Sequence, residues 1–271
     1  MPELPEVETT RRSIAPHLLE QRIVRVIVRE RRFRWPINPE LEYIITGQLI
    51  HAVERRAKYL LLRLTQGTAL LHLGMSGSLR ILRCGTSTNK HDHVDLDLSN
   101  GFCLRFTDPR RFGALLWTTD ALDQHPLLSH LGPEPLADNF TADYLYRAAR
   151  NRKIAIKPYI MDGRIVVGVG NIYANEALFL AGIHPQRAAG RLSKKHYGAL
   201  VKSIREVLQE AIAQGGTTLR DFTSGDGEPG YFKQRLRVYG RDRQSCRQCG
   251  EPIQVSRLGQ RATYYCNRCQ R

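Results

Sequence analysis

The chain has 271 residues, of which 42% are hydrophobic and 25% charged, and its 41 Lys and Arg against 26 Asp and Glu give a net charge of +15. This composition excludes wholesale disorder, and the length suggests about two domains. No run of roughly 18 apolar residues occurs, so we expect no membrane span, and the positive charge favours a polyanionic partner, nucleic acid before an acidic membrane.

The first residues, Met-Pro-Glu-Leu-Pro-Glu-Val-Glu, lack the apolar segment of a secretory signal, so we expect a cytosolic protein with reduced thiols. Removal of Met1 would give Pro2 a secondary α-amine, and α-amines titrate near ~8, so part of it is unprotonated at neutral pH. Such an amine forms a cationic iminium with an aldehyde-level carbon, and Glu3 beside it could transfer protons. Residue types alone favour a plainer interpretation, a terminus with Pro5 opening a helix.

Residues 5–19 predict a helix, with Val7, Ile14, Leu18 and Leu19 on one side. Short β-branched or alternating segments follow, separated by Gly, Asn, Ser or Pro. Because no long helix lies between them, they predict a β-sandwich or flattened barrel rather than a parallel sheet. The expected strands cover residues 23–28, 49–55, 59–64, 69–73, 78–82, 93–98, 103–106 and 114–118.

The pattern changes after a Gly-Pro-Glu-Pro stretch at residues 132–135, which predicts a linker. Helical periodicity then indicates a helix at 141–150 that Thr141 caps and a helix at 171–181 that Gly182 ends. The longest helix is expected at 193–214, before two glycines. The glycine-rich residues 223–230 predict a loop.

Four of the six cysteines are arranged as two pairs with two residues inside each pair: Cys246, Cys249, Cys266 and Cys269. Each pair offers two thiolates to one metal ion, so the four predict a closed, structural zinc site. Residues 255–265 between the pairs predict a β-hairpin with Arg261 near its turn. A basic ribbon held by zinc suits a DNA groove, although Arg261 could equally be a solvated hairpin residue. Cys84 and Cys103 are isolated, and we expect both in the core.

A glycine turn, Val-Gly-Val-Gly at 167–170, precedes the helix that begins at Asn171. Tyr173 occupies the third glycine position of a dinucleotide fingerprint, which excludes that function. The turn still suits an anion such as a DNA phosphate, with Asn171 as a further donor; a simple capped turn is equally consistent. Lys58 ends a basic run, where a lysine can donate to a phosphate or a leaving group but is more often an ordinary strand-end cation.

His91 and His93 are expected on one strand face, a spacing that a metal pair could use. No third ligand lies nearby in sequence, so phosphate binding or a core histidine is favoured over a metal. The stretch 108–113 places Arg110, Arg111 and Phe112 in one turn. Guanidinium groups can anchor phosphates and a ring can wedge between bases, which suits a protein that probes a duplex. Surface arginines beside a core phenylalanine are the alternative.

Several stretches together resemble the formamidopyrimidine-DNA glycosylase family. They are MPELPEVE, RRAKYLLL, HLGMSGSLR, KHDHVD, DPRRFG, VGVGNIYANEALF, GGTTLRDF and the four-cysteine tail, in this order along the chain. The resemblance implies that the chain excises oxidised purines from double-stranded DNA, chiefly 8-oxoguanine opposite cytosine and formamidopyrimidines, and then cleaves the abasic site by β,δ-elimination.

The implied fold is α+β and multidomain. A catalytic β-sandwich with a leading helix is expected at 1–119, a linker at 120–140, a helix–two-turn–helix DNA-binding module with a lesion-capping loop around 217–231 at 141–236, and a zinc-finger hairpin at 237–271. One structural zinc ion is implied. We expect a monomer in the cytoplasm, associated with the nucleoid through DNA.

The resemblance also implies roles for individual residues. Pro2 attacks the anomeric carbon and forms a Schiff base, and Glu3 protonates the sugar ring oxygen. Lys58 and Arg261 are the proton donors of β- and δ-elimination. The DNA contacts, including the side chains that fill the gap left by the everted nucleotide, are His91, Arg110, Arg152, Asn171, Met75 and Phe112.

Two other interpretations stay open. Glycosylases resembling endonuclease VIII share this terminus and fold but act on oxidised pyrimidines; Leu4, the DPRRF stretch and the loop near Gly225 favour the purine branch. A zinc-dependent DNA-binding protein without catalysis is the alternative from another class. Borohydride trapping separates the two classes, because only an enzyme with a sugar Schiff base becomes joined to DNA. The amine mechanism requires that the mature protein lacks Met1.

Overall fold

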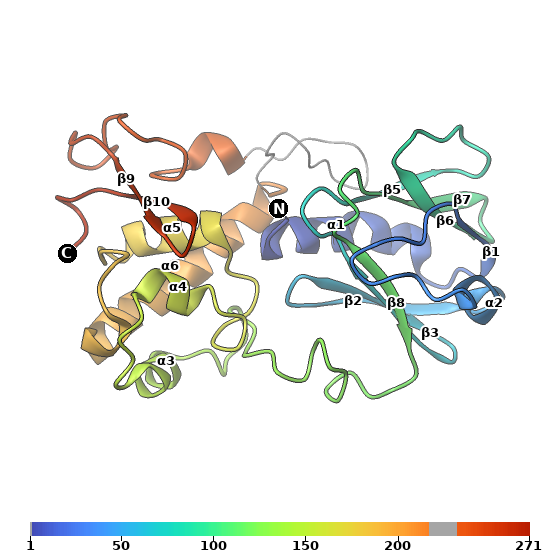
Figure 1. Cartoon of the computed structure of the whole chain (residues 1–271), viewed down its shortest axis with the longest axis horizontal. Coiled ribbons are helices and arrows are strands. Elements are labelled where there is room, and N and C mark those ends of the chain that lie inside the picture. The colour runs from blue at the N-terminus through green and yellow to red at the C-terminus, as the bar shows by residue number, and fades with distance from the viewer. Residues whose placement is uncertain (1, 217–231) are drawn as a thin grey trace. The chain divides into compact units, whose positions relative to one another are not determined.

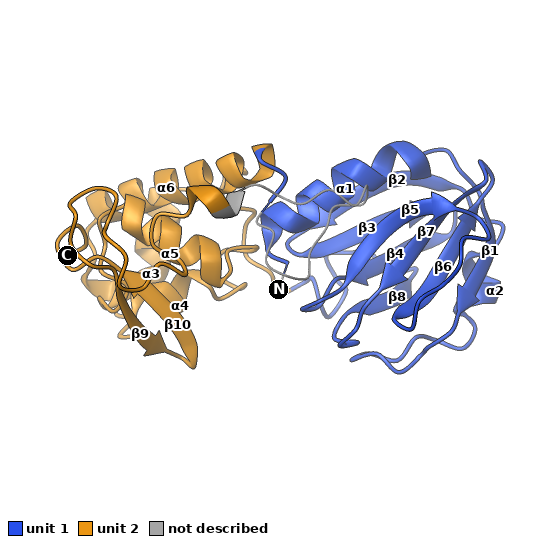
Figure 2. Cartoon of the chain, turned by 90° about the horizontal axis from the view of Figure 1, so that it is seen from above, with its two compact units in different colours: residues 1–129, 214–233 blue, residues 130–213, 234–271 orange. Residues whose placement is uncertain are grey.

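The computed structural model describes residues 2–216 and 232–271, and the chain divides into two compact units. Unit 1 comprises residues 1–129 and 214–233, and unit 2 comprises residues 130–213 and 234–271 (Figure 2). The expected domain boundaries at 119, 140 and 236 stay predictions. The glycine-rich loop expected at 223–230 and the lesion-capping loop expected around 217–231 lie outside the described residues.

Unit 1 contains an antiparallel β-sandwich of two four-stranded sheets, as the sequence predicted (Figure 1). One sheet has the order β1-β6-β7-β5 and the other the order β2-β3-β4-β8. The strands are β1 (Ile23–Val28), β2 (Ile50–Arg56), β3 (Tyr59–Leu64), β4 (Gly67–His72), β5 (Ser78–Arg83), β6 (Asp92–Leu98), β7 (Phe102–Thr107) and β8 (Ala114–Thr118).

Alternating apolar side chains build the core of the sandwich. Leu60, Leu62 and Leu64 of β3 share one face and are at most 5% exposed. Because successive strand residues point to opposite faces, this spacing directs all three inward. Burial of each such side chain stabilises the fold by about 1.5–3 kcal/mol.

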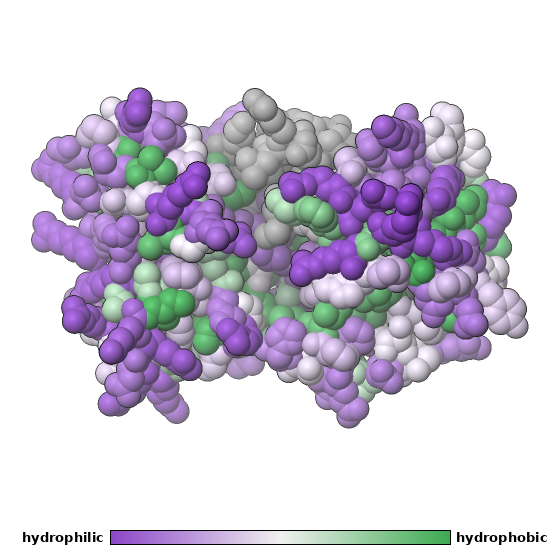
Figure 3. Space-filling view, in the orientation of Figure 1, coloured by the Kyte–Doolittle hydropathy of each residue, from purple (hydrophilic) through white to green (hydrophobic). Residues whose placement is uncertain are grey.

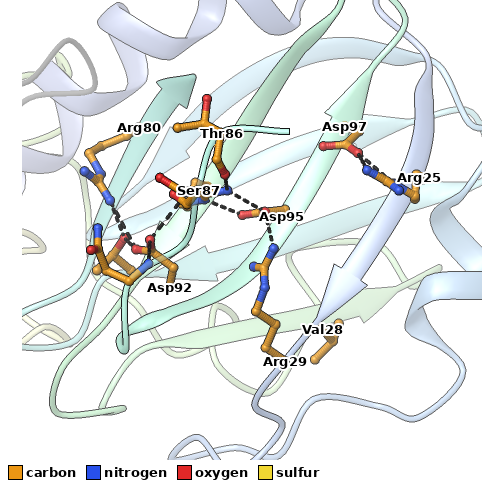
Figure 4. Close-up of polar contacts among 12 residues, drawn as sticks. Arg25, Val28, Arg29, Arg80, Thr86, Ser87, Asp92, Asp95 and Asp97 are labelled. Carbon is orange, nitrogen blue, oxygen red and sulfur yellow. Dashed lines mark hydrogen bonds and ion pairs between the residues drawn. The ribbon is translucent and has the colours of Figure 1, made fainter. Parts of the chain in front are cut away.

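The aspartates of β6 are buried as well, because arginines from neighbouring segments pair with them (Figure 4). Arg29 Nη2 lies 2.5 Å from Asp95 Oδ2, and Arg105 donates to the same carboxylate at 2.8 and 2.9 Å. Arg105 also donates to the carbonyl oxygens of Thr86 and Ser87. Buried charges are tolerated when they are paired and hydrogen-bonded, so this network accounts for the Asp-rich strand and holds the loop between β5 and β6.

Helix α1 (Leu4–Leu18) contacts β2, β3 and β5. Val7, Ile14 and Leu18 are at most 1% exposed, as the helical spacing predicted. The expectation that Leu19 shares this apolar side is wrong, since Leu19 is 41% exposed. The helix ends at Leu18, and Leu19 leaves the helical conformation with ψ 134°.

Unit 2 contains helices and one β-hairpin. The predicted helices at 141–150, 171–181 and 193–214 agree with the structure to within one residue at each end. Thr141 Oγ1 accepts the expected capping bond from the Tyr144 N–H at 3.1 Å. The described elements that follow β8 in the chain are α3 (Ala142–Ala149), α4 (Ile156–Ile160), α5 (Asn171–Leu180), α6 (Lys194–Ala213), the 3₁₀ turns η1 (Ala189–Arg191) and η2 (Phe232–Arg235), β9 (Gln254–Leu258) and β10 (Arg261–Tyr265).

Two helices were not predicted: α2 (Leu41–Ile45), which contacts β1, and α4. Each has five residues, too few for a 3.6-residue period to appear in the sequence. Among the described helices we find no candidate for a membrane-spanning segment.

The glycine expected to end α5 does so. Gly182 has φ +67°, its N–H donates to Phe179 O, and the Ile183 N–H donates to Leu178 O. These are the two bonds of a Schellman motif, whose left-handed residue is usually glycine.

One expectation about the cysteines is wrong. Cys103 is buried in β7, but Cys84 is exposed. Cys84 follows the last residue of β5, and its Sγ donates to Phe102 O at 3.1 Å. The strand has left the apolar interior at this point, so the isolated position of Cys84 in the sequence did not indicate a core site.

Candidate functional site

Pro2 and Glu3 lie at the start of α1. Pro2 is buried, and Glu3 is the N-cap residue, 2% exposed. Glu3 and Glu6 form a capping box, in which each side chain accepts a hydrogen bond from the other's backbone N–H; the bond to Glu6 Oε2 measures 2.8 Å. This pairing fixes a carboxylate beside Pro2, the arrangement that proton transfer near a terminal amine requires.

Lys58 lies in the turn between β2 and β3 rather than at the end of a strand. The register pairs Arg56 with Tyr59, so Ala57 and Lys58 form a two-residue turn in which Ala57 has φ +55°. Short hairpin turns fix the register of both strands, so the backbone position of the lysine is fixed as well.

An ion-pair network ties this turn to α1. Arg55 Nε donates to Glu8 on α1 at 3.1 Å, and Arg55 Nη1 donates to Ala57 O at 2.9 Å. Burial raises the pKa of Glu8, but hydrogen bonds from Arg11 and Arg12 outweigh burial and hold the pKa at about 2. The carboxylate therefore stays charged at neutral pH and keeps the β2–β3 turn against the helix that begins at the terminus.

Two loops of unit 1, residues 73–77 and 108–113, carry the side chains expected to enter a duplex. Met75 is 38% and Phe112 43% exposed. Figure 3 shows many hydrophilic side chains on the face that it draws, with apolar ones among them. The Arg110 guanidinium carbon lies 4.8 Å from the centre of the Phe112 ring. All three side chains line one cavity of about 640 Å³, together with Arg32, Phe33, Arg34, His72, Gly74 and Arg111. Exposed apolar side chains among arginines indicate a partner surface.

His72, at the end of β4, was not predicted as a site residue. Its Nδ1 accepts a hydrogen bond from the Gly74 N–H at 3.0 Å, so the neutral ring carries its proton on Nε2. Burial, with Lys58 and Arg34, lowers the pKa of His72 to about 4. The ring is therefore a neutral donor at neutral pH. The one signal in the sequence for a functional role of His72 was its position directly before the Leu-Gly-Met-Ser-Gly turn.

Arg111 differs from Arg110 in its contacts. Arg111 Nη1 donates to Glu30 at 2.8 Å, and Arg111 O accepts a hydrogen bond from the Arg34 N–H at 3.0 Å. Both contacts tie the 108–113 loop to residues 30–34. The proposed DNA contact of Arg111 stays a prediction, and this tether is an additional function that the sequence did not indicate.

The two histidines considered as a metal pair do not share a strand face. β6 begins at Asp92 with an irregular register up to Val94, so His91 precedes the strand. The rings of His91 and His93 are 6.3 Å apart, and His93 Nε2 lies 2.9 Å from Asp108 O. His93 is thus a buried, hydrogen-bonded histidine, and His91 stays available as the predicted DNA contact.

Unit 2 carries the other predicted DNA contacts. α5 begins at Asn171 directly after Gly170, so the positive end of the helix dipole lies at the glycine turn. One turn further, Asn175 Nδ2 donates to Asn171 O at 2.5 Å. Arg152 is exposed between α3 and α4, where its carbonyl oxygen accepts a bond from the Gly190 N–H at 2.9 Å. Both positions suit contacts with an anion.

The four predicted metal ligands converge in unit 2. All four Sγ atoms lie within 4.8 Å of one another, with 3.9 Å between Cys246 and Cys269 and 3.4 Å between Cys249 and Cys266. A tetrahedral site with Zn–S bonds of about 2.3 Å requires sulfurs about 3.8 Å apart, so the cluster fits one structural zinc ion. Within the described part of the chain, no other group of three or more metal-binding side chains meets this criterion.

Arg261 lies at the tip of the β9–β10 hairpin. Gly259 and Gln260 form the two-residue turn with φ +53° and +63°, and Arg261 pairs with Leu258 across it. Two central residues with positive φ are typical of a type I′ turn, which matches the twist of the strands. The arginine therefore begins a regular strand and is exposed.

Buried polar side chains that the sequence did not indicate fasten this hairpin to α4 and α5. Lys157 Nζ donates to Ala262 O and to Thr263 Oγ1, both at 2.8 Å. Asn175 Oδ1 accepts a bond from the Tyr264 N–H at 2.8 Å. Lys157 and Asn175 are each 1% exposed. Since β10 starts with the arginine at the tip, these bonds position that arginine.

Glu176 fastens the segment that precedes the zinc cysteines. Its carboxylate accepts bonds from the backbone N–H groups of Arg237, Val238 and Tyr239 at 2.8, 2.9 and 2.8 Å. Burial raises the pKa of Glu176, while the three N–H groups favour its charged form. α5 thus carries both a predicted DNA contact at its start and the side chains that hold the zinc module.

Family models match three successive parts of the chain. They describe the formamidopyrimidine-DNA glycosylase N-terminal domain at residues 1–115, the formamidopyrimidine-DNA glycosylase H2TH domain at 131–223, and a zinc finger found in FPG and IleRS at 244–271. The formamidopyrimidine-DNA glycosylases of Stutzerimonas stutzeri and Methylococcus capsulatus are 59% and 60% identical over 271 residues, which is all of this chain and all of each relative.

Solved structures show the same similarity. The MutM (Fpg) protein of Thermus thermophilus has a TM-score of 0.89 and 38% identity, covering 99% of this chain and 98% of its own. Lactococcus lactis Fpg in complex with DNA that contains an abasic site has a TM-score of 0.91 and 33% identity, covering 99% of both chains.

Proposed function

Because the chain belongs to the formamidopyrimidine-DNA glycosylase family, we propose that it excises oxidised purines from double-stranded DNA and then cleaves the abasic site. The expected lesions are 8-oxoguanine opposite cytosine and formamidopyrimidines. The observation that carries this proposal is full-length similarity to glycosylases that bear this name, together with a Lactococcus lactis structure whose DNA contains a Fapy-dG lesion.

We assign base removal to the start of α1. With Met1 removed, the Pro2 nitrogen attacks C1′ of the deoxyribose and the bond to the damaged base breaks. The base leaves with the bonding electron pair and takes up the proton that the Pro2 nitrogen loses. Glu3 gives its proton to the ring oxygen as the sugar opens, which leaves a cationic iminium between Pro2 and C1′. The burial of Glu3 and its capping box support this assignment, because both hold the carboxyl group beside the proline.

Strand cleavage follows from the electron demand of the iminium. The cation makes the C2′ proton acidic; loss of this proton expels the 3′-phosphate, and a second elimination expels the 5′-phosphate. We assign Lys58 as proton donor for the first step and Arg261 for the second. The network through Arg55 and Glu8, which ties the Lys58 turn to α1, supports the first assignment.

We assign DNA binding to side chains from each of the two units. Phosphate and base contacts are proposed for His91, Arg110, Arg111, Arg152 and Asn171, and His72 joins them as a neutral donor. Met75, Arg110 and Phe112 fill the space of the everted nucleotide, since a base can be processed only outside the stack. The shared cavity and the exposure of Met75 and Phe112 support this role.

The chain's DNA partner carries oxidised purines or abasic sites, and we propose that the protein acts as a monomer. We also propose a cytoplasmic location at the nucleoid. Four thiolates that hold zinc require a reducing compartment, which supports this location.

Borohydride trapping tests the proposal. Protein whose first residue is verified as proline should become covalently joined to a duplex with 8-oxoguanine opposite cytosine, and much less to one with thymine glycol. Pro2→Gly should lower trapping at least about a hundredfold, because it replaces the secondary amine that forms the iminium. Preferred excision of thymine glycol would favour the endonuclease VIII-like alternative. Verified protein that never cross-links to damaged DNA would refute the enzyme and leave a zinc-dependent DNA-binding protein.

A further inference from the structure

Asp108 begins the 108–113 loop, which carries Arg110 and Phe112, and its side chain contacts the 73–77 loop, which carries Met75. The residue is 0% exposed. Its Oδ1 accepts bonds from Ser76 Oγ at 2.8 Å and from the Arg110 N–H at 3.3 Å, and its Oδ2 accepts a bond from the Gly113 N–H at 2.8 Å. Both carboxylate oxygens are thus used. Oδ1 binds the 73–77 loop and the start of the 108–113 loop, and Oδ2 binds the end of the 108–113 loop.

The same loops also meet backbone to backbone. Gly74 has φ +61°, and a Cβ atom there would lie 2.4 Å from the Phe112 carbonyl carbon and 2.5 Å from the Gly113 nitrogen. No side chain fits that space, so glycine permits the contact. Ser76 Oγ also accepts a bond from the Arg110 N–H at 3.2 Å, which closes a small network around the carboxylate.

We propose that Asp108 is a positioning residue that locks the two loops into one rigid wedge. On this inference, which rests on the proposed function, Met75 and Phe112 are presented together before DNA binds. Because the two loops are already fixed relative to each other, ordering them adds no free-energy cost to extrusion of the lesion. Asp108 itself touches neither the DNA nor the reacting atoms.

The role depends on an acceptor at both oxygens. In Asp108→Asn the shape is kept, but one oxygen becomes an NH₂ group. If the NH₂ group faces Gly113, it meets the N–H of that residue. If it faces the other way, it meets the Arg110 N–H. The first orientation places two donors against each other in a buried position, where an unsatisfied donor is costly. The second removes the acceptor of the Ser76 hydroxyl and leaves the Arg110 N–H with Ser76 Oγ as its acceptor, so both orientations weaken the network.

The experiment compares two reactions on one DNA sequence: single-turnover excision of 8-oxoguanine opposite cytosine, and cleavage at a preformed abasic site. A 2-aminopurine beside the lesion reports unstacking directly. We expect Asp108→Asn to lower both the rate of excision and the rate of the fluorescence increase at least about tenfold, because extrusion requires the wedge. Abasic cleavage should change less than about threefold, because no base has to leave the stack.

Asp97→Asn is the matched control. Asp97 is another buried carboxylate of the same sandwich, bound to Arg25 at 2.7 Å, and it belongs to neither loop. Equal losses in both reactions of Asp108→Asn, or a similar selective loss in Asp97→Asn, would show a general weakening of the fold and overturn the proposal. Unchanged rates in both reactions would overturn it too.

Ser76→Ala provides a second test if Asp108→Asn fails to fold. It removes one donor to Asp108 and should slow excision selectively by a few fold; no selective effect overturns the proposal. Failure of the proposed function would look different, because wild-type protein would then trap neither substrate.

Discussion

At the scale of single residues, His72 shows how burial sets a protonation state that DNA binding can use. The folded pKa is about 4, against an ordinary value of 6.5. The neutral ring is favoured in the fold, so this contribution to stability is complete above about pH 6.5 and is lost as the pH falls toward 4. Between about pH 6 and 8 the ring should bind phosphate as a neutral donor whose charge does not change.

Two measurements check this prediction. The Cε1 proton resonance of His72 should titrate near pH 4, and a midpoint near 6.5 would contradict the prediction. His72→Gln keeps a neutral polar side chain without the titration. Its midpoint of thermal unfolding should therefore fall less steeply than that of the wild type between about pH 6.5 and 4.

Single residues also show where sequence reasoning stops. The pairing of Glu3 with Glu6 follows from a spacing of three residues at a helix start, and the sequence contains that spacing. The state of His72 depends on a backbone N–H from Gly74 and on Arg34, which comes from a distant segment. Local periodicity does not predict the burial or the direction of a side chain that lies beyond the end of a strand. For the same reason, the prediction for Cys84 was wrong.

At the scale of elements, the β9–β10 hairpin should act as a unit whose position depends on Lys157. Lys157→Met removes two hydrogen bonds to β10 and leaves the half-buried Ala262 carbonyl oxygen without this donor, a cost of about 1 kcal/mol. We expect the second elimination, assigned to Arg261, to slow roughly fivefold relative to the first, since one displaced donor serves only that step.

The ratio of β- to β,δ-elimination products on a denaturing gel measures this effect. The zinc content should stay at one ion per chain, because none of the cysteines is changed. Lys202→Met, an exposed lysine on α6, is the control and should leave the product ratio unchanged. A Lys157→Met enzyme with the wild-type ratio would show that the hairpin is positioned by other contacts.

Long, periodic elements could be predicted from the sequence, and single turns could not. α6 repeats its apolar side chains over 20 residues, and β3 alternates between two faces, so both were identified. α4 has five residues and contains Pro158, which obscures a helical pattern. Since α4, one of the two helices that were not predicted, carries Lys157, the support of the hairpin was missed with it.

At the scale of the whole molecule, the excess of 41 Lys and Arg over 26 Asp and Glu should make DNA binding strongly salt-dependent. If roughly four cationic side chains neutralise phosphates, the logarithm of the binding constant should fall with the logarithm of salt concentration with a slope of about −4. Arg152→Gln should weaken binding and reduce this slope by about 1, because one counterion fewer is released.

Fluorescence anisotropy with a duplex that contains an abasic-site analogue, over a range of salt concentrations, gives the slope. Arg164→Gln is a suitable control, because Arg164 is paired with Asp162 at 2.7 Å. A slope that Arg152→Gln leaves unchanged would remove Arg152 from the phosphate contacts.

The sequence predicted the order of the parts but not the contacts that assemble them. Cysteine spacing predicted the zinc site because four ligands in two pairs have few other uses in a reduced compartment. The bonds from Glu176 to residues 237–239 and from Lys157 to Thr263 join segments far apart in the chain. A single sequence carries no signal for such pairings, so the fastening of the zinc module became visible only in the fold.

The capping box at the start of α1 gives one side chain two duties. Glu3 closes the first turn of a helix and is also the proposed proton donor, so a substitution that tests the chemistry can unwind its own surroundings. Selection acting on either duty constrains the other. Tuning the acidity of this carboxyl group would therefore require compensation at Glu6, its reciprocal partner, before any gain in catalysis could be kept.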